Sequence, residues 1–191
     1  MAESAMSIVK AALRESAEAA LNLEGLAGDV LEASRMLVAC IKSGNKVMFC
    51  GNGGSAADSQ HLACELVEKY SEKRKALPAM ALTTDTSILT AVPNDENFGM
   101  LFSRQIEALG KKGDVLVALS TSGKSPNVLR GLDQARSMHI RTIGLTGEDG
   151  GKMAGRCDLL IKAPSSTVAR IQECHITLGH AIVQVVESEL L

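Results

Sequence analysis

The sequence predicts an α/β fold in which helices cover both faces of a parallel sheet. Five short apolar runs, each typical of a buried strand, alternate with helical segments along the chain. Two of these runs end in loops of glycine and hydroxyl residues that lead into a helix. The length of 191 residues suits one domain. We therefore expect a single domain over 1–191, with N-terminal helices in 1–45 and the sheet unit and terminal helix in 46–191.

The elements follow from spacing and from turn residues. Apolar positions at helical spacing predict two N-terminal helices, Met6–Leu21 and Val30–Ile41. The five strands are expected at Lys46–Cys50, Ala79–Leu82, Val115–Leu119, Arg141–Leu145 and Leu159–Ile161. The helices between them are expected at Ala56–Lys69, Phe98–Leu109 and Asn127–Met138. A run from Thr167 to about Leu190, interrupted only by Gly179, predicts one long terminal helix.

Composition excludes several classes of protein. The net charge of -2, the absence of Trp and the 2% of aromatic residues give neither a basic surface nor a stacking platform for nucleic acid. No apolar stretch approaches the ~18 residues of a membrane span, and the polar N-terminal residues do not resemble an export signal. Five cysteines without a C-x-x-C pair suggest buried thiols in a reducing compartment. We expect a cytoplasmic protein without nucleic-acid or membrane partners.

The first loop, Gly51-Asn52-Gly53-Gly54-Ser55, follows an apolar strand and opens a helix. Its glycines allow a sharp turn with exposed N–H groups, which suits a phosphorylated ligand. Ser55 is expected to cap the helix, and Asp58 resembles the acidic end of a capping box. The G-x-G-x-x-G spacing of a dinucleotide site is absent, which disfavours NAD.

The second loop, Ser120-Thr121-Ser122-Gly123-Lys124-Ser125, lies between an apolar strand and a helix that begins at Pro126. Hydroxyls, free N–H groups and a helix N-terminus suit a phosphate monoester, and the Walker pattern is absent. Taken alone, the loop is equally well explained by hydroxyls that cap the helix and satisfy the turn. Two such loops at successive strand ends favour a ligand site.

Four side chains on two helices form a candidate metal site. His61 and Glu65 are four residues apart and share a helix face, and Gln172 and His180 are eight residues apart on the terminal helix. Two imidazoles, a carboxylate and an amide suit zinc. Each histidine alone is more often a hydrogen-bonded packing residue. His139 and His175 lack such partners and are expected at the surface or in packing. The charged interval Glu68–Lys75 is expected to be a solvated helix end and loop.

These motifs together resemble the sugar isomerase (SIS) domain family, and within it the isomerases that act on heptose phosphates. The residues that carry the resemblance, over nearly the whole chain and in order, are Gly51–Ala56, His61 with Glu65, Asn94-Asp95, Ser120–Gly123 and Ala169–Glu173. The resemblance implies conversion of D-sedoheptulose 7-phosphate into D-glycero-D-manno-heptose 7-phosphate, the first step toward ADP-heptose and the lipopolysaccharide core. It also implies a cytoplasmic homotetramer with one zinc ion per subunit.

The resemblance assigns roles residue by residue. The substrate-binding residues would be Asn52, Gly53, Gly54, Ser55, Glu65, Asn94, Asp95, Ser120, Thr121, Ser122, Ser125 and Gln172. The zinc ligands would be His61, Glu65, Gln172 and His180. Moving a carbonyl between C2 and C1 needs a base and an acid, which we assign to Glu65 and His180. A zinc-bound group carries protons poorly, so ligation and proton transfer would have to alternate.

Two other readings of the same domain remain open at this stage. Some relatives act as non-catalytic binding proteins, including one that associates with the replication initiator, and a sugar-phosphate sensor is a further alternative. Those binding proteins lack the acid and base pair. The presence of both Glu65 and His180 favours the enzyme.

Overall fold

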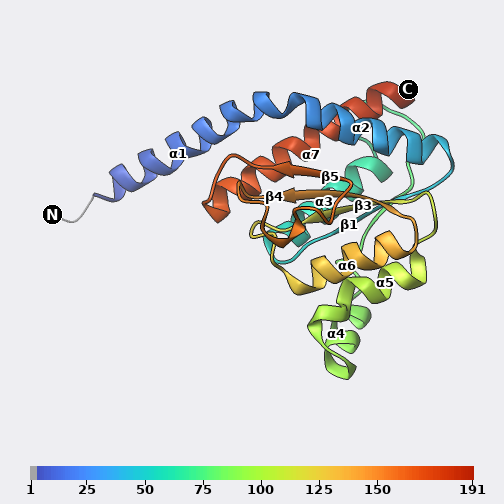
Figure 1. The fold of residues 1–191 in the computed structure, drawn as a ribbon. Helices are drawn as coiled ribbons and strands as arrows, with labels where there is room; N and C mark the ends of the chain where they lie inside the picture. The colour runs from blue at the N-terminus through green and yellow to red at the C-terminus, as the bar shows by residue number, and fades with distance from the viewer. Residues whose placement is uncertain (1–3) are drawn as a thin grey trace.

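The computed structural model describes residues 4–191 and contains a five-stranded parallel sheet between two layers of helices (Figure 1). The strands are β1 Val47–Cys50, β2 Ala79–Ala81, β3 Val115–Leu119, β4 Arg141–Thr146 and β5 Leu159–Lys162. Their spatial order is β2-β1-β3-β4-β5, and each neighbouring pair is parallel. The predicted fold class is confirmed, and each predicted strand agrees with the observed one to within a residue at either end.

The predicted helices are present to within three residues at either end, and one further helix was not predicted. They are α1 Ala5–Leu21, α2 Ala27–Lys42, α3 Gly54–Val67, α4 Thr86–Asp95, α5 Leu101–Leu109, α6 Pro126–Ser137 and α7 Val168–Leu190, with short 3-10 helices at Asn22–Leu26, Phe98–Met100 and Gly151–Met153. Helix α4 was not predicted, because Pro93 lies inside it. The Asp85 side chain caps its first turn by accepting from the Ile88 N–H at 3.1 Å.

Alternating side chains of the strands build two separate cores. On one face, Val47 and Phe49 of β1 pack with α1, α2, α3 and α7. On the other, Met48 and Cys50 of β1 pack with α5 and α6, and α4 lies against this second layer. Figure 1 shows α7 and α4 on opposite sides of the sheet.

The strand order places a topological switch between β1 and β3. These strands are neighbours in the sheet, but the chain continues from β1 to β2 on one side and from β3 to β4 on the other. The loops after β1 and β3 therefore meet at the carboxyl edge, where open α/β sheets bind their ligands. Helices α3 and α6 begin at this edge. The fold thus brings together the two loops predicted from the sequence.

Helix α1 extends away from the body of the protein (Figure 1). Several of its large apolar side chains are exposed, namely Met6, Ile8, Val9, Leu13 and Leu21. Such a row is uncommon on an isolated monomer and favours burial against another protein surface. Within residues 4–191, no helix has the length and apolar character needed to cross a membrane.

The cysteines are free thiols. Cys40, Cys50 and Cys174 are buried, as expected. The expectation is wrong for Cys64, which is exposed, because it lies on the outer side of α3 next to the buried Ala63.

Candidate active site

The glycine loop after β1 places the start of α3 beside α7. Gly53 has a φ of 56°, in the left-handed region, and is the N-cap of α3. A Cβ at Gly54 would lie 2.3 Å from Nε2 of Gln172, so glycine allows the amide of α7 to approach this turn closely.

The predicted helix cap is wrong. Helix α3 begins before Ser55, because the turn at Gly53 supplies the change of direction, and no side chain caps it. Ser55 is therefore inside the first turn and is buried, and Asp58 forms no capping box. A helix N-terminus without a side-chain cap has free N–H groups, and these can donate hydrogen bonds to a bound anion.

The loop after β3 gathers hydroxyl groups at the start of α6. The Oγ atoms of Ser120 and Ser125 are 3.0 Å apart, and Ser120 is buried. The Gly123 N–H donates to the Ser120 carbonyl at 3.0 Å. At Gly123, with a φ of 60°, a Cβ would lie 2.4 Å from the Gly150 carbonyl oxygen. The loop is therefore a tight turn, with Thr121 half-buried and Ser122 exposed.

An asparagine pair joins the two loops. Asn52 Nδ2 donates to Asn127 Oδ1 at 2.9 Å, and Asn127 Nδ2 donates to Asn52 Oδ1 at 2.8 Å. Asn127 is buried on α6. The sequence analysis missed this residue, although an amide directly after the Ser125-Pro126 helix start was a signal that could have identified it. The pair fixes the spacing between the two candidate phosphate-binding turns.

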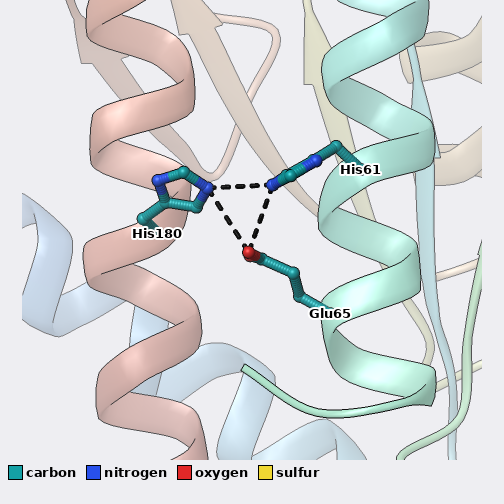
Figure 2. A group of neighbouring side chains, drawn as sticks. All are labelled: His61, Glu65 and His180. Atoms are coloured by element: carbon teal, nitrogen blue, oxygen red, sulfur yellow. Dashed lines mark hydrogen bonds and ion pairs between the residues drawn. The ribbon is translucent and has the colours of Figure 1, made fainter. Parts of the chain in front are cut away.

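Three predicted metal ligands meet between α3 and α7, as Figure 2 shows. His61 Nε2 lies 3.1 Å from Glu65 Oε1 and 3.0 Å from His180 Nε2, and His180 Nε2 lies 3.4 Å from Glu65 Oε1. The His61 side chain is 54% exposed, His180 35% and Glu65 16%, so solvent reaches the cluster from the histidine side. The second oxygen of Glu65 is buried without a hydrogen-bond partner among the described residues.

The cluster fits a zinc ion. A tetrahedral zinc with bonds of about 2.0–2.1 Å separates its ligand atoms by roughly 3.3 Å. The three distances between ligand atoms are close to this value without rearrangement of the helices. Two imidazole nitrogens and a carboxylate oxygen also form a common donor set for zinc, with a fourth position free.

Gln172 and the Asn94-Asp95 pair lie apart from the cluster. The Gln172 side chain contacts Gly54 at the start of α3. His61 lies seven residues further along this helix, so about 10 Å of helix separates Gly54 from the cluster. Asn94 and Asp95 are exposed at the end of α4, where Asn94 Nδ2 donates to Asp95 Oδ1 at 2.8 Å. Helix α4 lies across the sheet from α7 (Figure 1). The roles assigned to these three residues stay predictions.

Asp58 lies on the site face of α3, one turn before His61. Burial raises the pKa of its carboxyl, while the nearby His61 and His180 lower it. Its Oδ2 atom is buried and has no hydrogen-bond partner within residues 4–191. The sequence analysis considered this residue only as a cap, so the carboxylate beside the cluster is an additional finding.

The other two histidines have the surface and packing positions that were predicted. His139 is exposed at the end of α6. His175 is fully buried on α7, with Nε2 3.1 Å from the Thr146 carbonyl oxygen. Burial lowers the pKa of His175 to about 4, although its bond to Thr146 acts in the opposite direction.

The prediction that Glu68–Lys75 is solvated is wrong for Arg74. Its side chain is 3% exposed and forms an ion pair with the equally buried Glu187 of α7, with Nε 2.9 Å from Oε1. The partner lies 113 positions away in the sequence. Local charge pattern could not reveal this contact.

Comparison with known proteins identifies the family. A model of the SIS domain matches residues 11–147. A phosphoheptose isomerase of Rhodospirillum rubrum is 51% identical over 182 residues, which are 95% of this chain and 97% of the relative. The chain belongs to the phosphoheptose isomerase family. A second phosphoheptose isomerase, from Aliarcobacter butzleri, is 48% identical over 96% of this chain and 97% of its own.

Solved structures of phosphoheptose isomerases have the same fold. The enzyme from Neisseria gonorrhoeae has a TM-score of 0.91 at 42% identity, covering 97% of this chain and all of its own. The enzyme from Francisella tularensis has a TM-score of 0.94 at 30% identity with the same coverage. The agreement extends over the whole fold, including the helices that bear the cluster.

Proposed function

We propose that this chain is the isomerase that interconverts D-sedoheptulose 7-phosphate and D-glycero-D-manno-heptose 7-phosphate. The cluster of Glu65, His61 and His180 supports the proposal, because it lies in a phosphoheptose isomerase fold on the helix that begins at one of the two candidate anion-binding turns. The start of α3 and the cluster are separated by about 10 Å along the helix. The substrate likewise bears its carbonyl and its phosphate near opposite ends of a seven-carbon chain. The non-catalytic reading is not favoured, because both groups needed for proton transfer face one another.

The proposed chemistry is a proton transfer between C1 and C2. Glu65 removes the proton from C1 of the ketose as His180 gives a proton to the C2 oxygen, which forms the enediol. Glu65 then returns its proton to C2, and the C1 hydroxyl gives its proton to the imidazole of His180, which leaves the aldehyde at C1. Zinc held by His61, Glu65 and His180 would supply positive charge that stabilises the enediolate oxygens, and the family role of Gln172 as a further ligand would require its amide to move from Gly54 toward the cluster.

The direct test is an isomerisation assay with sedoheptulose 7-phosphate, sedoheptulose, and other ketose and aldose phosphates. We expect turnover of the heptulose phosphate and a far lower kcat/KM for the unphosphorylated sugar. Equal turnover of both sugars, or no turnover of either, would refute the proposed reaction. By its family, the product would enter ADP-heptose and lipopolysaccharide core synthesis in the cytoplasm.

Phosphate binding by the second loop is expected to affect KM more than kcat. The Ser120→Ala and Ser125→Ala variants each remove a hydroxyl near the start of α6, where hydrogen bonds to a charged group contribute about 1.5–3 kcal/mol. We expect KM to rise roughly tenfold or more in each variant, measured by steady-state kinetics. Ser137→Ala, at the exposed end of the same helix, is the matched control. An unchanged KM in both loop variants would exclude this role.

Zinc binding is expected at one ion per subunit. Protein purified without chelator should contain zinc, and removal of the metal should lower activity that added zinc restores. His61→Ala should lose the bound zinc, whereas His139→Ala, which alters an exposed histidine outside the cluster, should retain it. Elemental analysis of both variants measures this. Full activity of the metal-free protein would make the ion dispensable.

A homotetramer is expected from the exposed apolar side of α1 and from the family. Assembly would also give Asn94 and Asp95 a route to the sugar hydroxyls of a neighbouring subunit, since within one chain they lie across the sheet from α7. Light scattering should report four subunits. Changing Leu13 to Asp, which places a charge among exposed apolar side chains of α1, should yield smaller and less active species. A fully active monomer would contradict this expectation.

A further inference from the structure

Glu187 of α7 binds the segment that follows α3 through both carboxylate oxygens. Its Oε1 accepts from the Tyr70 N–H at 3.0 Å and from Arg74 Nε at 2.9 Å. Its Oε2 accepts from the N–H groups of Ser71 and Glu72 and from the Ser71 hydroxyl, at 2.9, 3.1 and 3.1 Å. We refer to residues 70–74 held in this way as the Glu187 clamp. A buried carboxylate with five donors holds a segment in one position.

The clamp reaches the cluster along two routes. Arg74 Nη2 donates to the backbone carbonyl of Glu65 at 2.7 Å, and its Nη1 donates to the carbonyl of Leu66 at 2.9 Å. The Tyr70 ring lies against His180, with centroids 5.9 Å apart and planes inclined by 44°. The His180 ring also neighbours that of His61, at 5.2 Å between ring centroids. The imidazole of His180 therefore has two ring neighbours, one of them from the clamp.

From these contacts we propose that Tyr70 and Glu187 are positioning residues of the isomerase site. Glu187 fixes the clamp, the Tyr70 ring limits the orientation of the His180 imidazole, and Arg74 holds the turn that carries Glu65. The inference rests on the proposed function, because it concerns the two groups assigned to proton transfer. Neither Tyr70 nor Glu187 touches the reacting carbons in this account.

The position of Glu187 explains how a substitution of this residue would alter the alignment of His180 and Glu65. Glu187 lies seven residues after His180, so both side chains project from the same face of α7, about two turns apart. The clamp spans this distance and ends at the imidazole and at the Glu65 backbone. Proton transfer requires alignment to a fraction of an ångström, and a misplacement of 1 Å can cost about 100-fold in rate.

The first test replaces the ring and leaves the clamp in place. The Tyr70 N–H that Glu187 binds is a backbone group, so Tyr70→Ala retains that bond. We expect kcat to fall about tenfold while KM changes by less than about twofold. Tyr70→Phe restores the ring and should restore kcat. Unchanged kcat in Tyr70→Ala overturns the inference, as does an equal loss in Tyr70→Phe, which would assign the effect to the hydroxyl.

The second test observes the clamp without measuring turnover. The chain has one tyrosine and no tryptophan, so its intrinsic fluorescence reports Tyr70 alone. In Glu187→Gln, acrylamide should quench the Tyr70 fluorescence more strongly than in the wild type. The same variant should lower kcat at least as much as Tyr70→Ala. Glu189→Gln, which alters an exposed carboxylate on α7, should leave both unchanged. Equal quenching in the wild type and in folded Glu187→Gln overturns the clamp, and an unfolded Glu187→Gln leaves the decision to the Tyr70 variants.

Failure of the inference is distinguishable from failure of the proposed function. If the wild-type protein turns over the heptose phosphate and the Tyr70 variants do so equally well, only the positioning role is wrong. If the wild type has no turnover, the proposed function is wrong, while the quenching experiment still reports whether Glu187 holds the segment.

Discussion

Glu65→Gln is expected to lower turnover by at least ~100-fold while the protein stays folded. The amide has nearly the same size as the carboxylate and can still accept a hydrogen bond from His61, but it cannot take a proton from carbon. Glu65 is partly buried between α3 and α7, so the isosteric change leaves the packing of these helices in place. Single-turnover kinetics isolates the chemical step, and a thermal melt reports the fold.

The matched experiments separate proton transfer from substrate binding. His180→Gln should cause a loss of similar size, since it removes the assigned acid, and calorimetry should show sugar phosphate binding that is much less affected. Glu68→Gln changes an exposed carboxylate three residues further along the chain and should have wild-type kinetics. Near-wild-type turnover in Glu65→Gln or in His180→Gln would remove the role assigned to that residue.

Acidification from about pH 7 to about pH 4 is expected to destabilise the protein through His175 by about 3 kcal/mol. The folded pKa of this histidine is about 4, below the ordinary value of 6.5, because the ring is fully buried. Between these two values the unfolded chain binds a proton that the folded protein does not. The stability associated with the neutral ring is therefore present above pH 6.5 and is lost as the pH falls toward 4.

The measurement is the free energy of unfolding as a function of pH, taken from denaturant titrations. His175→Gln can still donate to the Thr146 carbonyl but does not titrate, so its stability should change less over this range than that of the wild type. His139→Gln, at an exposed histidine, should follow the wild-type curve. Parallel curves for the wild type and His175→Gln would show that this residue does not contribute to acid sensitivity.

Most of the fold could be predicted because its signals are local. Buried parallel strands appear in the sequence as continuous apolar runs. The loops after β1 and β3 contain glycine and hydroxyl residues between a strand and a helix, which is a local signal for a turn of this kind. Helix α4 was missed because Pro93 is a poor helix residue, and its effect is limited by its position in the last turn. The cap at Gly53 was missed because a left-handed glycine replaced the expected side chain.

The site was predictable in its residue types and less so in its geometry. His61 and Glu65 share a helix face by spacing alone, but their meeting with His180 depends on the packing of α3 against α7. The pairs Asn52 with Asn127 and Arg74 with Glu187 join residues that are 75 and 113 positions apart. Hydrogen bonds of this kind follow from the tertiary fold, and no local pattern in one sequence indicates them.

The order of the elements along the chain has a consequence for biosynthesis. Helix α7 follows all five strands, and it contributes His180 to the cluster and Glu187 to the clamp. A nascent chain that has completed its sheet and both loops therefore still lacks His180, one of the two residues proposed to transfer protons. Helix α7 must also dock on α2, which emerges from the ribosome much earlier, and contacts between such distant segments form slowly. Activity should thus arise in one step at the end of folding, after the turns that follow β1 and β3 have already formed.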